Sequence, residues 1–221
     1  MAVLAPQVVP IFATPFGVAG IEDAAALNPV LAALFASRAT AQWRDPLAPP
    51  GAFRSRDILF EWPEEPVHQA LRGILAAVTA VAASISELSA EQFAALRPEA
   101  RAWFTIVGKD GCVPPASVPN SSWLAVYCVT APPPSPSRFD SGTLRLLESR
   151  TGSSFQDASQ ASLRLPYRPS HCTWHPVPGQ VVVFPAALSH EIALVRAAGV
   201  LTLVTVRVRF VASDKAWMPP W

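Results

Sequence analysis

The sequence predicts an α+β domain in which helices come first and a β-sandwich or β-barrel follows. Apolar residues recur at helical spacing through the first hundred residues, whereas after Glu99 they gather in short runs between proline-rich or polar loops. A length of 221 residues fits one domain with a single core. We therefore predict one domain over residues 1–221, with a strand and supporting helices in 1–100, a strand-rich core in 101–211 and an apolar tail in 212–221.

The first hundred residues predict one strand and three helices. Residues 8–16 contain two prolines and suit an edge strand, because proline cannot donate a hydrogen bond to a central strand ladder. Asp23 is expected to cap a helix that runs to about Ser37. A longer helix is expected over residues 66–84, with a proline in its first turn. Residues 89–92 match the capping box of a short third helix.

The second half of the chain predicts a set of short strands. Each candidate is rich in β-branched, aromatic or leucine side chains and is bounded by turn residues. The six candidates are residues 102–107, 123–129, 144–147, 163–165, 180–184 and 200–210. Such a sheet needs cover on one face, which the preceding helices can provide.

The charge and hydropathy of the chain limit its possible partners. A formal net charge of +1 at pH 7 gives no bulk attraction to nucleic acid, so no nucleic-acid partner is predicted. Charged residues make up 15% of the chain, against about 25% in ordinary soluble domains. The mean hydropathy is +0.29. A surface that is poor in charge predicts that other protein subunits cover part of it.

The apolar segments predict no membrane span. The most apolar helix candidate, residues 74–83, is shorter than the roughly 20 residues that cross a bilayer, so we expect a core helix. The first residues lack the basic region and cleavage site of a secretion signal. We predict an intracellular, cytoplasmic location, compatible with peripheral contact with a membrane complex. The three cysteines are an odd number and are expected to be reduced thiols.

Several short segments follow one another in a characteristic order. They are Ile11 to Phe16, Ala102-Trp103, Pro119-Asn120-Ser121, Ser141-Gly142-Thr143-Leu144, Pro178-Gly179, Phe184-Pro185 and His190-Glu191. In this order they resemble the 2-oxoglutarate/Fe(II)-dependent oxygenases of bacteria and phages. The resemblance implies a double-stranded β-helix (jelly-roll) core backed by N-terminal helices.

The resemblance also implies where an iron site belongs. Members of the family hold Fe(II) by three protein ligands on one side of the metal. The matching positions here are Ala116, Val118 and His190. A methyl and an isopropyl group offer no lone pair, so we expect these positions to be vestigial.

The resemblance places the arginine that anchors 2-oxoglutarate at the position of Val200. Arg207 and Arg209 lie an odd number of residues further along the same expected strand. Side chains alternate between the faces of a strand, so both are expected to point away from the face that Val200 uses. We therefore predict no cofactor, neither Fe(II) nor 2-oxoglutarate.

A replacement metal site is the alternative. His171, Cys172 and His175 lie close together in the sequence and ahead of His190. Zinc accepts histidine and cysteine ligands in such a mixture. The usual zinc spacings are absent, however, and the segment is better explained as a polar loop.

Three functions remain open. The leading one is a non-catalytic oxygenase-like protein that acts as a structural or accessory subunit of a larger assembly, with Trp217, Met218 and Trp221 as its partner-binding residues. The second is an active Fe(II)/2-oxoglutarate dioxygenase, a hydroxylase with a metal site rebuilt around His190. The third is a small-molecule binding module that uses the emptied barrel. Its mouth, formed by Ala116, Val118 and Val200, would suit a hydrophobic ligand.

Overall fold

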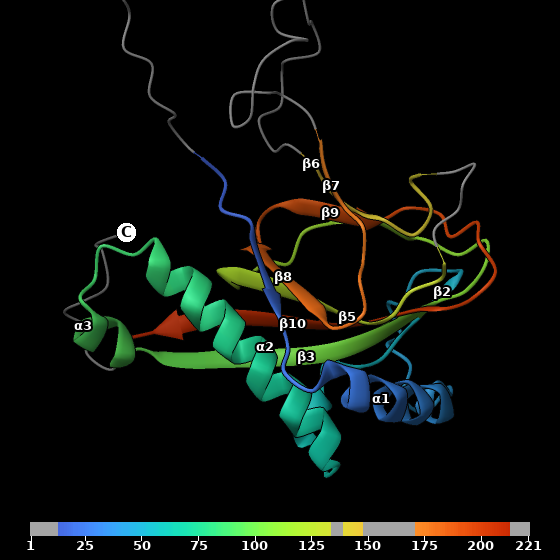
Figure 1. Cartoon of the computed structure of the whole chain (residues 1–221), viewed down its shortest axis with the longest axis horizontal. Coiled ribbons are helices and arrows are strands. Elements are labelled where there is room, and N and C mark those ends of the chain that lie inside the picture. The colour runs from blue at the N-terminus through green and yellow to red at the C-terminus, as the bar shows by residue number, and fades with distance from the viewer. Residues whose placement is uncertain (1–12, 134–138, 148–170, 213–221) are drawn as a thin grey trace, which may run out of the picture.

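The structure is a computed structural model that describes residues 13–133, 139–147 and 171–212. Two antiparallel sheets face each other, and two helices cover the outer face of the larger sheet (Figure 1). The predicted α+β class is confirmed. In the larger sheet the strand order is β1-β8-β5-β10-β3-β2, and in the smaller sheet it is β4-β9-β6-β7.

The larger sheet is built around two long paired strands. Its members are β1 (Gly17–Gly20), β2 (Ala52–Arg54), β3 (Arg97–Val107), β5 (Trp123–Thr130), β8 (Gln180–Pro185) and β10 (Leu201–Val211). The smaller sheet contains β4 (Val113–Ala116), β6 (Leu144–Leu147), β7 (His171–Trp174) and β9 (Ser189–Ile192). Strands β3 and β10 pair with each other in register over their full length.

The helices are α1 (Ala24–Arg38), α2 (Glu65–Ser84) and α3 (Ala90–Ala94), with a short 3₁₀ helix η1 (Leu59–Glu61). Helix α2 buries one stripe at helical spacing, formed by Val67, Ala70, Leu71, Ile74, Ala77, Val78 and Ala82. Among the helices of the described residues, α2 is long and apolar enough to cross a membrane. It packs this stripe on the larger sheet, as expected of a core helix.

Strand β5 separates two apolar cores. Its residues Ala125 and Tyr127 face the helices, whereas Leu124, Val126 and Cys128 face the space between the sheets. All six central residues of β5 are buried for this reason, since both faces of the strand are covered. The inner core also contains Phe184.

The helix starts are predicted in part. The capping box at Ser89 is confirmed, because its Oγ accepts from the Gln92 N–H and the Gln92 side chain accepts from the Ser89 N–H. Helix α1 does follow Asp23, but the Asp23 side chain makes no capping hydrogen bond. Its backbone has φ 56°, in the left-handed region, whereas a side-chain cap requires an extended residue.

The shortest strands are not predicted from the sequence. Strands β2, β4, β7 and β9 have three or four residues each, and β7 occupies the segment predicted as a polar loop. They exist because a neighbouring strand supplies their hydrogen bonds; β6, for example, pairs with both β7 and β9. The predicted strand at 163–165 lies outside the described residues, as does most of the predicted strand at 8–16. Strand β1 begins directly after the latter, at the sheet edge.

Candidate functional site

A cavity of about 470 Å³ opens between the two sheets. Its lining comes from β2, β3, β5 and β10 on one side and from β4, β6 and β9 on the other. Small-molecule sites in proteins range from about 300 to 1,000 Å³, so the cavity has the size of a ligand site. Much of its lining is apolar and includes Val126, Ile192 and Leu203.

The fold brings the three expected iron-ligand positions together at one side of this cavity. Strands β4 and β9 are antiparallel, and Ala116 lies directly opposite His190. Val118 follows β4, and its N–H donates to the Ala186 carbonyl at 2.9 Å. All three side chains line the cavity. Positions that are far apart in the sequence therefore form one cluster.

His190 is a half-buried imidazole whose surroundings favour its neutral form. Burial lowers its pKa, and this effect exceeds the opposing hydrogen bond to the Leu188 backbone. Its Nδ1 lies 3.2 Å from the Leu188 carbonyl oxygen, which only accepts, so Nδ1 carries the proton and Nε2 keeps its lone pair. The ring also packs edge-on against Phe184, with centroids 5.5 Å apart. His190 thus offers a single acceptor to the cavity.

The described residues do not fit a metal held by three side chains. Among residues 13–133, 139–147 and 171–212, no group of three His, Cys, Asp or Glu side chains could hold a metal ion. Cys172 and His190 both pair with Leu146, from opposite sides of β6. Two strand spacings, about 10 Å, therefore separate their backbones. Of the positions suggested by the resemblance, only His190 carries a donor atom.

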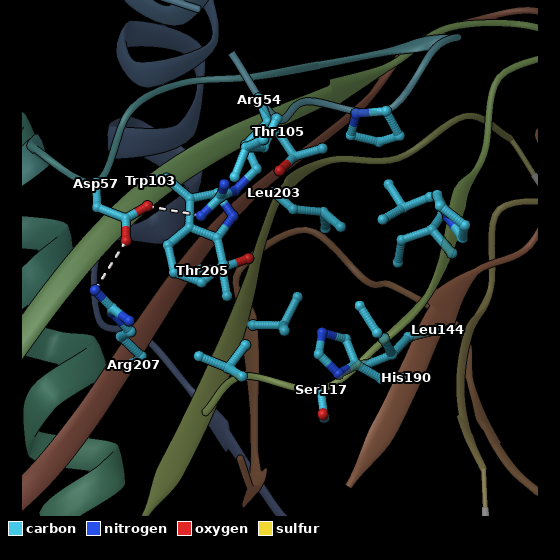
Figure 2. Close-up of a pocket in the computed structure, with 18 of the residues that line it drawn as sticks. Arg54, Asp57, Trp103, Thr105, Ser117, Leu144, His190, Leu203, Thr205 and Arg207 are labelled. Carbon is cyan, nitrogen blue, oxygen red and sulfur yellow. Dashed lines mark hydrogen bonds and ion pairs between the residues drawn. The ribbon is translucent and has the colours of Figure 1, made fainter. Parts of the chain in front are cut away.

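The opposite side of the cavity is charged. Figure 2 shows Asp57 between two arginines, with its Oδ1 2.6 Å from Arg54 Nη2 and its Oδ2 3.2 Å from Arg207 Nη2. Arg54 also pairs with Asp45, and its guanidinium lies 4.3 Å from the centre of the Trp103 ring. Arg54 therefore contacts Asp45, Asp57 and Trp103, whereas Asp57 is the one ion-pair partner of Arg207 within the described residues.

Strand β10 contributes a different face to the cavity than the sequence suggested. Leu203, Thr205 and Arg207 line the cavity, whereas Val200 lies before β10, is 46% exposed and is not part of the lining. Arg207 does point away from the face of Val200, but the face of Arg207 is the cavity face. The prediction that Val200 helps to form an apolar mouth of the cavity is therefore wrong. The spacing of Leu203, Thr205 and Arg207 at every second position of one strand could have indicated that their side chains share the cavity face.

The remaining predicted site residues do not join this cluster. His171, Cys172 and His175 are exposed on and beside β7. Trp217, Met218 and Trp221 lie outside the described residues. The cysteines are free thiols, as predicted, with Cys128 buried and its pKa raised to about 12 by that burial.

No family model matches the sequence, and no curated protein matches it. Solved structures do match. A prolyl-4-hydroxylase from Pseudomonas putida has a TM-score of 0.59 at 14% identity, over 89% of this chain and 92% of the other. HygX from Streptomyces hygroscopicus, with nickel and 2-oxoglutarate bound, has a TM-score of 0.57 at 13% identity, over 91% and 84%. A Trichoplax adhaerens prolyl hydroxylase in complex with a hypoxia inducible factor peptide fragment has 0.55 at 10%, over 88% and 83%.

These similarities establish the fold of the chain. The sequence identities of 10–14% are too low to establish its activity. The chain has the double-stranded β-helix fold of the 2-oxoglutarate/Fe(II) oxygenases, and the predicted jelly-roll core backed by helices is confirmed. The prediction of no cofactor is contradicted. HygX has nickel and 2-oxoglutarate bound, so this fold does accommodate a metal and 2-oxoglutarate. The prediction rested on Ala116, Val118 and Val200 and placed Arg207 on the face away from the site, whereas Arg207 lines the cavity and Val200 does not.

Proposed function

We propose that this protein is a non-catalytic oxygenase-fold protein whose barrel binds a small organic ligand. The observation that carries the proposal is the pairing of Ala116 with His190 at the wall of a ligand-sized cavity. Iron oxygenase chemistry relies on a facial triad of protein ligands. A cavity with one imidazole and a largely apolar lining favours binding over that chemistry.

The lining indicates how a ligand would be held. Val126, Ile192 and Leu203 would exclude water from its apolar part, while Arg207 and the His190 Nε2 would orient its polar groups. The 2-oxoglutarate that HygX holds is the first compound to test, because it can use Arg207 as a carboxylate partner.

Thermal unfolding with a panel of ligands tests binding. The panel contains 2-oxoglutarate and apolar carboxylates, and a ligand at 100 times its Kd would stabilise the protein by about 2.7 kcal/mol. The Ala116→Trp variant places an indole in the cavity and should lose this stabilisation. Ala80→Trp, on the exposed face of α2, is the matched control and should keep it. Stabilisation that is equal in all three proteins would place the ligand outside the barrel, against the proposal.

Turnover of 2-oxoglutarate separates binding from catalysis. The protein is incubated with Fe(II), ascorbate, oxygen and 2-oxoglutarate, and succinate is measured. The proposal expects no succinate above the protein-free control. Succinate formed by the wild-type protein and lost in His190→Gln would instead establish an active oxygenase with a site around His190.

The role of accessory subunit remains a second candidate. The low charge fraction of 15% favours it, and so does the exposure of apolar side chains such as Val18, Val30 and Ile85, each more than half exposed. A protein of this kind should elute from size exclusion with a second chain in constant ratio when it is purified from its native source. A monomer without any partner chain would contradict the role.

A further inference from the structure

The inner face of the β3–β10 pair changes from apolar to basic along its length. Side chains at every second position of a strand point to the same face of the sheet, and directly opposed residues of two paired strands share that face. Starting from Leu201, the opposed pairs on the inner face are Leu201 with Val107, Leu203 with Thr105, Thr205 with Trp103, Arg207 with Arg101, and Arg209 with Glu99. The two strands therefore lead from the apolar interior of the barrel to a basic surface outside it.

A second cavity of about 650 Å³ lies at the basic end. It adjoins the first cavity at Asp57 and Arg207, which line both. Its lining is mainly polar and also includes Arg101, Asn120 and Ser121. One molecule could therefore place an apolar part in the first cavity and a polar part in the second.

Arg101 and Arg207 are two like charges on paired strands that an anionic ligand would stabilise. Like charges directly opposite each other on paired strands are destabilising, and Arg101 stands opposite Arg207. Arg207 meets Asp57 at 3.2 Å, but within the described parts of the chain Arg101 forms no ion pair. The next pair along, Arg209 with Glu99, is neutralised at 2.7 Å. A ligand anion between Arg101 and Arg207 would relieve the repulsion that the protein leaves in place.

The charge of the second cavity indicates what kind of anion it suits. Four arginines and three carboxylates line it, which leaves one net positive charge: Arg97, Arg101, Arg207, Arg209, Asp57, Glu61 and Glu99. A single charge matches a carboxylate better than a doubly charged phosphate. The planar guanidinium fork also fits a carboxylate by two parallel hydrogen bonds.

We propose that the two cavities form one site for an amphiphilic monocarboxylate, with its apolar chain in the barrel and its carboxylate on Arg101 and Arg207. The proposal rests on the ligand-binding function above and names the class of ligand. It assigns Arg101 and Arg207 a role in recognising the head group, and it assigns the lining around Val126 and Leu203 a role in holding the chain.

Isothermal titration calorimetry with octanoate and octan-1-ol tests the assignment, because the two probes share a chain and differ in charge. Octanoate should bind once per chain and more tightly than the alcohol. Arg101→Gln and Arg207→Gln should each weaken octanoate by about tenfold or more, the scale of a charge-assisted hydrogen bond, and leave the alcohol unchanged. Arg72→Gln removes an exposed arginine on α2 and is the matched control. Arg207→Lys should restore part of the octanoate affinity.

The outcomes distinguish the head-group assignment from the function on which it rests. Octanoate binding that is lost in Ala116→Trp but unchanged in both arginine variants would overturn the assignment and leave barrel binding in place. The absence of binding by octanoate, octan-1-ol and 2-oxoglutarate alike would overturn both. Arg207→Gln also removes the ion pair with Asp57 and so could prevent folding. In that case Arg101→Gln alone decides, because Arg101 takes part in no ion pair among the described residues.

Discussion

Burial gives His190 a predictable effect on stability. Its folded-state pKa is lowered, so below its ordinary value of 6.5 the unfolded chain binds a proton more readily than the folded protein. The contribution of His190 to the free energy of unfolding should therefore be constant above about pH 6.5 and fall as the pH drops below it. The slope from this one group is at most about 1.4 kcal/mol per pH unit. Urea unfolding between pH 5 and 8 measures it.

A variant identifies His190 as the source of that slope. His190→Gln cannot titrate, so its stability should depend less on pH between 5 and 6.5 than that of the wild-type protein. His175→Gln alters an exposed histidine beside β7 and is the control. The assignment is wrong if His190→Gln keeps the wild-type slope.

A buried hydrogen bond joins helix α1 to the larger sheet. The Tyr127 hydroxyl donates to Asn28 Oδ1 at 2.5 Å, and both side chains are buried. Tyr127→Phe leaves the Asn28 oxygen without its partner, which should cost about 1–3 kcal/mol of unfolding free energy. The double variant Asn28→Leu/Tyr127→Phe removes both groups and should cost less than the two single changes added together. Urea unfolding of the four proteins gives the coupling, and strict additivity would contradict it.

At the level of single residues, the sequence predicted one side of the cavity and missed the other. Ala116, Val118 and His190 were found because ordered segments of the family surround them. Arg54 and Asp57 had no such signal, since they come together with Arg207 only through the pairing of β2 with β3 and of β3 with β10. Contacts of that range leave no periodic pattern in the sequence.

Among the elements, the loop between β3 and β4 depends on a glycine. A Cβ at Gly111 would lie 2.2 Å from the Gly51 carbonyl oxygen and 3.0 Å from that of Gly108. These are backbone atoms that cannot turn aside, so Gly111→Ala should cost about 1–3 kcal/mol of stability. Gly108→Ala is the matched control in the same loop, because its Cβ would meet nothing within 4 Å. Thermal unfolding measures both, and equal stabilities would show that the loop can shift.

Gly111 also affects the geometry of the cavity. Gly111 lies before β4, the strand of Ala116, and it packs against Gly51, which lies before β2, the strand of Arg54. Gly111→Ala should therefore weaken ligand binding as well as stability. Neither segment was predicted as a strand. Each has only a few residues and lies beside a proline-rich or polar loop, so its neighbour rather than its own sequence determines its conformation.

For the whole molecule, the predicted α+β order and the jelly-roll core agree with the structure because they rest on long features. Helix α2 and strands β5, β8 and β10 each carry a strong apolar pattern, and the ordered segments identified the fold. The prediction of no cofactor failed at the same scale. It rested on the residues at the expected iron-ligand and arginine positions, whereas the opposite wall of the cavity carries Arg54, Asp57 and Arg207.

The side chains at positions 116, 118 and 190, rather than the fold, are proposed to decide what this barrel does. Restoring two imidazoles tests that statement most directly. The variant Ala116→His/Val118→His would place three histidines around one point of the cavity, because residue 116 lies opposite His190. Titration with Co(II), followed by its visible absorption, should show binding at least about 100-fold tighter than in the wild-type protein. An affinity for Co(II) equal to that of the wild-type protein would contradict the placement of these positions around one metal.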